Sequence, residues 1–474
     1  MLAGLESLVG VLNDFLWSKI LIVMLIALGM YFTIRTKFVQ FRLAGEMFRL
    51  LGEGAKGGKN KGSISSFQAF CISTASRVGT GNLAGVAMAI SVGGPGAVFW
   101  MWLIALMGSA SAFVESTLAQ IYKVKDKSGF RGGPAYYMEQ GLKKRWMGVL
   151  FAVLITLCFG FVFNAVQANT ISQAFGTAYG IDPRLMGIIL SVVTGIIIFG
   201  GVKRVAKVAE FLVPFMAGAY VLVALYVVLT NLGQIPAVFA LIFKSAFGLE
   251  QAVGGGIGAA MMQGIKRGLF SNEAGMGSAA NAAATADVTH PVKQGLIQAL
   301  GVFVDTLLVC SATAFIVLLS GMYSTEGLDG IALTQAALSS HVGGWASSFV
   351  ALIVLLFAFS SVIGNYYYGE TNIEFMKSDK KWLTVYRLLV VGMVMFGSVA
   401  KISIVWDMAD LFMALMALLN LVAIALLGKV AFTALKDYMR QKKAGKNPEF
   451  HASVIPGLQV ECWQEEAGRD QKAV

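Results

Sequence analysis

The sequence predicts an all-α polytopic membrane protein with about eleven transmembrane helices. Of its 474 residues, 57% are hydrophobic and only 13% are charged, which leaves too few polar side chains to cover a water-soluble protein of this size. The apolar residues gather in runs of about twenty, the length that a helix needs to cross the hydrocarbon core. The basic residues are concentrated in alternate connections between these runs, as in membrane proteins of fixed orientation.

The boundaries of the expected spans follow from the apolar runs and are accurate to a few residues. They lie near residues 16–34, 65–92, 95–121, 147–173, 184–201, 209–230, 251–275, 295–320, 345–370, 383–401 and 406–434.

The charge of the connections predicts how the chain is oriented. Lys and Arg follow the first, third, fifth and ninth spans and the last one, whereas the 321–344 connection has none. Because basic residues are retained in the cytoplasm, we expect the N-terminus outside and the C-terminus inside a cytoplasmic (inner) membrane. The net charge of +11 therefore reflects orientation rather than nucleic-acid binding.

The spans predict a repeated architecture. If the 16–34 helix is set aside as an accessory helix, ten spans remain, and they divide into two groups of five with opposite orientation, 65–230 and 251–434. We expect residues 1–434 to form one transmembrane domain and residues 435–474 to form a cytoplasmic tail.

Two spans carry glycines and polar residues where an uninterrupted helix would be expected. The second has Gly79 and Gly81 with Thr80 and Asn82, and the seventh has the glycine-rich runs 254–258 and 264–268. In lipid a backbone group that leaves a helix must find another partner. Interrupted spans at matching positions of inverted halves indicate a solute site near the midplane. Close helix packing would also explain some of these glycines.

Three blocks of sequence resemble one family. They are the runs Gly93–Trp102 (GGPGAVFWMW), Gly268–Ser278 (GLFSNEAGMGS) and Phe357–Ser361 (FAFSS). These runs are similar to the alanine/glycine:cation symporters, also called sodium:alanine symporters, of the APC superfamily. The resemblance implies the leucine-transporter (LeuT-type) fold of two inverted five-helix repeats with two broken helices.

The resemblance implies how substrate would bind. The freed amides of Thr80 and Gly81 would hold the carboxylate of an amino acid, and Asn82 would supply a side-chain oxygen and amide to substrate or ion. Further candidates come from the fourth, seventh and ninth spans. The complete expected substrate set is Gly79, Thr80, Gly81, Asn82, Phe163, Asn164, Gln167, Gln263, Gly264, Ser361 and Asn365.

The same resemblance implies a sodium site. Its oxygen ligands would be the carbonyls of Ala75, Val78 and Phe357 and the hydroxyls of Ser360 and Ser361. Ordinary helix–helix hydrogen bonding is the alternative role of the two serines, and proton coupling remains open. No other cofactor is expected.

The identity of the substrate stays open because of Asn365. In members selective for small neutral amino acids we expect tryptophan at this position. An amide here would enlarge the pocket or add hydrogen bonds, so glutamine and asparagine are alternatives to alanine and glycine.

Ionisable residues at membrane depth are costly unless they are paired or wet. They are Arg77, Glu115, Lys266, Arg267, Glu273 and Asp305. We expect Arg77 to pair with Glu273 or Asp305 as a gate near the cytoplasmic side. A static ion pair that stabilises the fold is the alternative.

We therefore expect a symporter for Na+ and a small neutral amino acid. The sequence has no nucleophile elbow or HExxH motif, so we do not expect an enzyme. A passive channel is the less favoured alternative, because two broken helices in inverted halves suit alternating access better than a continuous pore.

Overall fold

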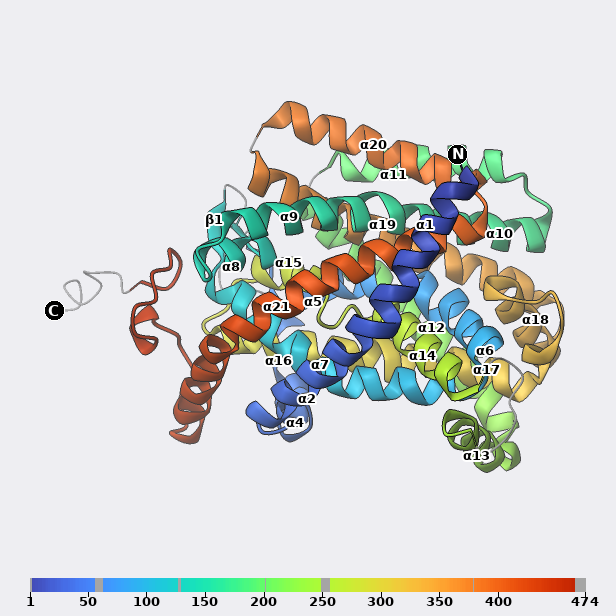
Figure 1. Ribbon diagram of the computed structural model, residues 1–474, viewed down its shortest axis with the longest axis horizontal. Coiled ribbons are helices and arrows are strands. Elements are labelled where there is room, and N and C mark those ends of the chain that lie inside the picture. Colours follow the sequence, from blue (N-terminus) through green and yellow to red (C-terminus); the bar gives the residue numbers. More distant parts are fainter. Residues whose placement is uncertain are drawn as a thin grey trace.

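The computed structural model describes residues 2–55, 63–126, 129–200, 202–248, 256–377 and 379–464. The long helices run along one common direction, which is horizontal in Figure 1. Helices α13 and α18 lie at the right-hand end of this view, and β1, α8 and the C-terminal tail lie at the left-hand end. We call the left-hand end the tail end and the other the distal end.

The chain begins with a long N-terminal rod and a short amphipathic segment. These are α1 (Leu2–Phe15), η1 (Leu16–Leu21), α2 (Ile22–Arg35), α3 (Val39–Arg42) and α4 (Ala44–Ala55).

The first repeat contains a broken helix, a two-stranded hairpin and four further spans. Its elements are α5 (Ser66–Arg77), η2 (Gly81–Gly85), α6 (Val86–Gly93), α7 (Ala97–Ile121), β1 (Val124–Asp126), β2 (Gly129–Arg131), α8 (Pro134–Gln140), α9 (Arg145–Ile155), η3 (Thr156–Phe163), α10 (Asn164–Tyr179), α11 (Pro183–Ile198) and α12 (Val202–Thr230). In the hairpin, Val124 pairs antiparallel with Arg131.

The second repeat follows a short connecting helix and again begins with a broken helix. Its elements, with the connection, are η4 (Leu232–Gln234), α13 (Ile235–Ala246), α14 (Gly256–Asn272), α15 (Ser278–Thr285), α16 (Pro291–Phe303), η5 (Val304–Cys310), α17 (Ser311–Ser320), η6 (Met322–Ser324), α18 (Gly330–Val342), α19 (Trp345–Met376), α20 (Lys380–Val399), α21 (Ile402–Lys443) and η7 (Ala452–Val454).

The eleven expected spans are all represented by helices. Among the described residues, eight helices are long and apolar enough to cross a membrane, and the first of them begins at Glu6 rather than near residue 16. The other three expected spans are the 16-residue α11 and the broken pairs α5–α6 and α14–α15. Helices α13 and α18 were not expected, because each is a short segment between spans.

The break in the seventh span differs from the one expected. Helix α14 runs without interruption through Gly264 and Gly268, and the chain leaves the helix only after Asn272. A Cβ on Gly264 would lie 2.3 Å from the carbonyl oxygen of Ala97, and one on Gly268 would lie 2.8 Å from Ile104. These two glycines therefore allow close packing on α7. Gly254 and Gly255 lie outside the described residues.

The two broken helices meet at the centre of the bundle. Helix α5 packs against α12 and α19, while α14 packs against α6 and α7. At the tail end, Ile64 before α5 forms a parallel bridge with Ala286 after α15, and the amide of Asp287 donates to the carbonyl of Ile64 at 3.0 Å. The starting segment of one broken helix is thus tied to the end of the other.

The N-terminal rod packs on the outside of the repeats. The indole of Trp17 donates to the carbonyl of Asp410 at 3.2 Å, and the amide of Asn13 donates to that of Asp407 at 2.9 Å. Both contacts join the rod to the distal part of α21. The rod is therefore an accessory element, as expected.

The C-terminal tail begins later than expected and returns to the bundle. Helix α21 continues beyond residue 434 to Lys443. Beyond it, the amide of Phe450 donates to the carbonyl of Thr289 at 2.9 Å, and the indole of Trp463 donates to that of Gln120 at 2.9 Å. Residues 444–464 thus dock against the tail ends of α16 and α7.

Candidate functional site

The centre of the candidate site is the break between α5 and η2. Val78 leaves helical geometry, with ψ at 90°, so α5 ends at Arg77. The amide of Gly79 then donates to the side-chain oxygen of Asn82 at 2.8 Å, and the amide of Thr80 donates to that of Gln167 at 2.9 Å. The freed backbone donors therefore already bind side-chain oxygens, the type of acceptor that a carboxylate would also present.

Glycine is required at this break because three other helices come very close. A Cβ on Gly79 would lie 2.2 Å from the hydroxyl of Ser361 and 2.9 Å from Oε1 of Gln167. A Cβ on Gly81 would lie 2.9 Å from the ring of Phe270. The glycines thus bring α10, α14 and α19 against the freed backbone.

The five expected sodium ligands converge beside the break. The hydroxyl of Ser360 donates to the carbonyls of Phe357 and Ala75 at 2.8 and 3.3 Å, and that of Ser361 donates to those of Phe357 and Val78 at 3.1 and 3.5 Å. All five residues are buried. Two hydroxyls and three carbonyls around one point are the neutral oxygen set that suits a hard monovalent cation.

A chain of amides extends from the break toward the tail end. Asn365, one helical turn after Ser361 on α19, donates to the side-chain oxygen of Asn164 at 3.1 Å and accepts from the hydroxyl of Ser76 at 2.7 Å. Asn164 in turn donates to the carbonyl of Gly160 at 3.0 Å. The two amides come from different repeats and bond to each other, so they form one polar wall.

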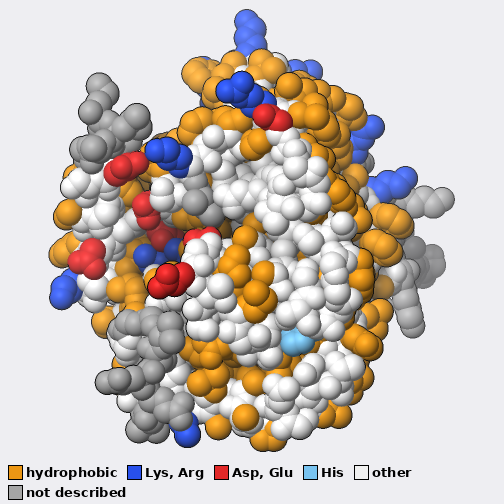
Figure 2. Space-filling model, turned by 90° about the vertical axis from the view of Figure 1, so that its right-hand side faces the viewer, with side chains coloured by type: hydrophobic (Ala, Val, Ile, Leu, Met, Phe, Trp, Pro, Cys, Tyr) orange, Lys and Arg blue, Asp and Glu red, His pale blue; other side chains and the backbone are white. Residues whose placement is uncertain are grey.

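Aromatic rings also pack beside the break. Phe163 on η3 lies 4.5 Å from Phe270 on α14, and Phe270 lies 4.8 Å from Trp406 on α21, measured between ring centroids. The guanidinium of Arg267 lies over Trp406 at 4.7 Å. Next to this stack, Lys266 and Arg267 both pair with Asp410. Figure 2 shows that basic and acidic side chains gather in a hollow of the distal face.

The second break contains a buried carboxylate. Glu273 has a left-handed backbone, with φ at +58°, and its side chain accepts from the hydroxyls of Ser76 and Ser278 at 2.6 and 2.5 Å. Ser76 thus joins Glu273 in one broken helix to Asn365 on α19. The strained backbone marks the second break as a built feature of the site.

A second carboxylate supports this break from α7. Glu115 accepts from the amides of Gly275 and Gly277 at 3.3 and 3.0 Å and from the side chain of Asn420 at 2.8 Å. The freed amides of the second break are thus bound by a side chain, as at the first break.

Asp305 holds Asn82 in place. It accepts from the amide of Asn82 at 2.7 Å and from the hydroxyls of Ser271 and Thr306 at 2.9 Å each. Asn82 therefore bridges its own broken helix and η5.

Arg77 pairs with neither expected partner in this conformation. Among the described residues its guanidinium donates to the carbonyl of Gln298 at 3.3 Å, whereas Glu273 and Asp305 bind hydroxyls and an amide. Its Nε and Nη2 atoms are buried without a partner in the described part of the chain. A gate formed by these three residues therefore remains a proposal about another conformation.

Two of the expected substrate residues lie elsewhere. Gln263 packs against Gly93: a Cβ added to Gly93 would lie 2.9 Å from the Cβ of Gln263. Gly264 faces Ala97 and Trp100. In this conformation α14 is unbroken there and turns this face toward the α6–α7 corner, so a substrate role for both residues stays a prediction.

Three residues beside the break were not predicted from the sequence. Ser76 connects two clusters of the site, and Phe270 and Trp406 belong to the aromatic stack, yet none of the three was singled out. Phe270 lies inside the Gly268–Ser278 block, which was the one available signal. Ser76 and Trp406 carry no distinguishing pattern, because only the tertiary structure brings them to the break.

The bundle, its two broken helices and the polar groups around them define a secondary transporter of the LeuT-type fold. The chain belongs to the sodium:alanine symporter family, whose profile matches residues 2–452. The family is one of transporters and not of enzymes.

Two curated relatives cover nearly the whole chain. It is 64% identical over 460 residues to the probable sodium/glutamine symporter GlnT of Bacillus subtilis, covering 97% of this chain and 96% of that protein. It is 59% identical over 462 residues to the amino-acid carrier protein AlsT of the same organism, covering 97% and 98%.

A solved structure shares the fold. MhsT in complex with L-phenylalanine superposes with a TM-score of 0.57 at 13% identity, covering 78% of this chain and 95% of that one. At this identity the likeness concerns the fold alone.

Proposed function

We propose that this protein imports a neutral amino acid together with Na+ by alternating access. It would lie in the cytoplasmic membrane with its tail end inside and the N-terminus outside, as the distribution of basic residues indicates. Substrate and ion would bind beside the α5 break and be released inward as one repeat moves against the other.

The observation that carries this proposal is the oxygen cluster beside the break. It joins Ala75 of α5 and Val78, directly after that helix, to Ser360 and Ser361 of α19. An ion that needs both helices would favour the conformation in which they are in contact, and this differential binding is what couples an ion gradient to a conformational change. Because the five ligands are carbonyls and hydroxyls, the cluster contains no carboxylate that could take up a proton. Na+ is therefore favoured over H+ as the coupling ion.

The substrate would replace internal hydrogen bonds. In the structure the backbone amide of Thr80 donates a hydrogen bond to the side-chain oxygen of Gln167. A substrate carboxylate would take over the amides of Thr80 and Gly81, and Gln167 would then be free to turn its amide toward the substrate.

We further propose glutamine as the preferred substrate. The amide pair Asn164–Asn365 offers both donors and acceptors to a carboxamide side chain. The name of the relative at 64% identity, a probable sodium/glutamine symporter, supports this choice. Alanine or glycine is the second candidate, supported by the name of the family and by the close walls of the site around Gly79.

Transport into proteoliposomes tests both proposals. Radiolabelled glutamine and alanine would be offered under an inward Na+ gradient, under K+ at matched potential and under a pH gradient. We expect accumulation only with Na+, with glutamine the stronger competitor. Uptake driven equally by a pH gradient would contradict sodium coupling, and downhill flux without accumulation would indicate a channel. Alanine uptake that excess glutamine does not inhibit would favour the second candidate.

The Arg77 gate has its own test. In the inward-closed state Arg77 would pair with Glu273 or Asp305 near the tail side of the break. Reversing both charges, as in Arg77→Glu with Glu273→Arg, would restore uptake lost in each single variant if the residues pair. Double variants with either partner that stay inactive, although they fold, would contradict the gate.

A further inference from the structure

A hollow at the tail end is lined mainly by basic side chains, together with a few apolar ones. It lies where α2 ends and α3 begins, against the last turns of α21, and encloses about 530 Å³. We call it the basic groove, and its cationic residues are Arg35, Lys37, Arg42, Lys436, Arg440 and Lys443. No acidic residue lines it within the described part of the chain.

Most of these cations have no acidic partner. Among the described residues only Arg440 forms an ion pair, with Asp437 on its own helix. The guanidinium of Arg42 donates to the carbonyls of Lys37 and Thr36 at 3.2 and 3.3 Å, which fixes its position without neutralising its charge. The groove therefore presents an unbalanced positive charge.

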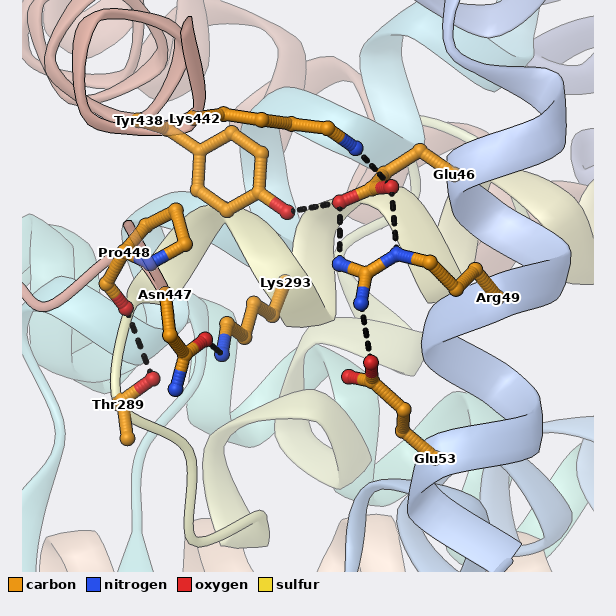
Figure 3. Close-up of polar contacts among 9 residues, drawn as sticks. All are labelled: Glu46, Arg49, Glu53, Thr289, Lys293, Tyr438, Lys442, Asn447 and Pro448. Carbon is orange, nitrogen blue, oxygen red and sulfur yellow. Dashed lines mark hydrogen bonds and ion pairs between the residues drawn. The ribbon is translucent and has the colours of Figure 1, made fainter. Parts of the chain in front are cut away.

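The neighbouring polar pocket shows the contrast. It lies between α4, α16 and the tail, and Figure 3 shows three of its four lining cations, Arg49, Lys293 and Lys442, engaged with partners inside the protein. Arg49 pairs with Glu46 and Glu53, Lys442 pairs with Glu46, and Lys293 donates to Asn447 at 2.7 Å. These three cations of the polar pocket thus bind carboxylates or amides of the protein, whereas most cations of the basic groove have no acidic partner among the described residues.

The groove also has an apolar floor, formed by Phe432, Leu435 and Met439. The guanidinium of Arg35 lies 5.1 Å from the ring of Phe432, so cation and floor are in contact. Exposed Ile34 and Phe38 continue the apolar surface beside the groove. A site with cations above an apolar surface suits a molecule that carries an anionic head and hydrocarbon chains.

We propose that the basic groove binds an anionic phospholipid. Its phosphate would lie among the six cations, and its acyl chains would follow the exposed apolar faces of α2 and α21. Basic residues near the ends of spans are expected of any protein with this orientation, so charge alone would not carry the proposal. The hollow itself, the lack of acids among its described lining residues and the apolar floor carry it.

A soluble anion fits these features less well. Nucleotides and inorganic phosphate gain nothing from an apolar floor at the membrane boundary, whereas a phospholipid occupies both parts of the site at once. Lipid bound here would bridge the accessory rod and α21.

Native mass spectrometry of the full-length protein in detergent tests the proposal. The protein would be titrated with phosphatidylglycerol and with phosphatidylcholine of the same chains. The groove variant would be Lys37→Gln/Lys436→Gln/Lys443→Gln. The matched control would be Lys143→Gln/Lys380→Gln/Lys381→Gln, which removes three exposed lysines elsewhere at this end.

We expect phosphatidylglycerol to bind the wild type and the control with the same affinity. It should bind the groove variant more weakly, by about tenfold or more, because each basic residue near an anionic lipid contributes to binding. Should the triple variant not fold, Lys436→Glu would place an acid in the groove and is expected to weaken binding similarly. An equal loss in groove and control variants, or no loss in a folded variant, would overturn the proposal. So would equal binding of phosphatidylcholine, or displacement of the lipid by millimolar inorganic phosphate.

Discussion

Ser360 and Ser361 show how single residues link the two repeats. Both serines lie on α19 in the second repeat, yet their hydroxyls reach carbonyls in and directly after α5 in the first. Asn365 repeats this pattern one turn later through Asn164 on α10. At the scale of residues, the proposed site consists of neutral oxygens and amides that face each other across the repeat boundary.

The sodium proposal predicts the effect of removing these hydroxyls. In Ser361→Ala and Ser360→Ala we expect the Na+ concentration for half-maximal uptake to rise about tenfold or more, since a contact to a charged group contributes roughly 1.5–3 kcal/mol. The matched control is Ser398→Ala, whose hydroxyl donates only within its own helix, to Val394. Sodium titrations of uptake would decide, and an unchanged half-saturation in both serine variants would argue against the site.

The glutamine proposal predicts a selective loss at Asn365. In Asn365→Ala we expect the KM for glutamine to rise about tenfold, the effect of roughly one polar hydrogen bond, while the KM for alanine changes little. Alanine uptake in the same variant serves as the internal control. If both KM values rise together, the residue supports the fold of the site and does not select the side chain.

Broken helices are the elements on which transport would depend. At both breaks side chains satisfy the freed amides, Gln167 and Asn82 at the first and Glu115 at the second. Glycine at the first break allows α10 and α19 to approach, whereas glycine within α14 only allows packing on α7. The two kinds of glycine therefore predict different mutant phenotypes.

A Cβ at the first break would displace the site. Gly79→Ala places the new atom 2.2 Å from the hydroxyl of Ser361, so either α5 or α19 must shift. We expect kcat/KM for uptake to fall by about 100-fold, the typical cost of misplacing reacting groups by about 1 Å. Gly218→Ala in α12, with nothing within 4 Å, is the control and should retain uptake. A fully active Gly79→Ala variant would contradict the assignment of the break.

A Cβ within α14 would instead affect packing. Gly264→Ala places an atom 2.3 Å from the carbonyl of Ala97, so α14 would have to move away from α7. We expect overpacking to lower the free energy of unfolding by about 1–3 kcal/mol, and with it the melting temperature and the yield. The KM of the protein that still folds should change little. A changed substrate preference at normal stability would instead support the predicted substrate role of Gly264.

At the scale of the whole molecule, the tail end is held together by a charged cluster that includes α4 and α21. Glu46 pairs with Arg49 and Lys442 and accepts from the hydroxyl of Tyr438 (Figure 3). The hydrogen bonds from Arg49, opposed by burial and assisted by Lys442 and Tyr438, lower the pKa of Glu46 to about 2.

This lowered pKa predicts acid sensitivity. Because the folded-state value lies below the ordinary 4.5, the stabilisation is complete above pH 4.5 and is lost as the pH falls toward 2. We expect a loss of about 1–2 kcal/mol, discounted because Arg49 is half exposed. Melting temperatures of detergent-solubilised wild type and Glu46→Gln between pH 7 and pH 3 would test it. The variant should lose this part of the pH dependence, and identical slopes would contradict the role of Glu46.

Much of the fold was predictable because the membrane imposes strong rules on sequence. Span length, the need to pair backbone groups and the placement of basic residues predicted the helices, and the glycines of the Gly79 run marked one break correctly. The second break was placed too early, since Gly264 and Gly268 have the same composition as a broken segment but serve packing. Local sequence does not distinguish these two uses of glycine.

The sequence by itself determined that this chain is an all-α membrane protein, its family, and the type of residue at the first break. Only the tertiary structure decided which groups meet there. Ser76, Phe270 and Trp406 lie beside the break, Gln263 and Gly264 face the α6–α7 corner, and six cations from two distant segments line one groove. The physical reason is that spans form through local hydrogen bonds and hydrophobicity, whereas a site forms where helices far apart in sequence pack together.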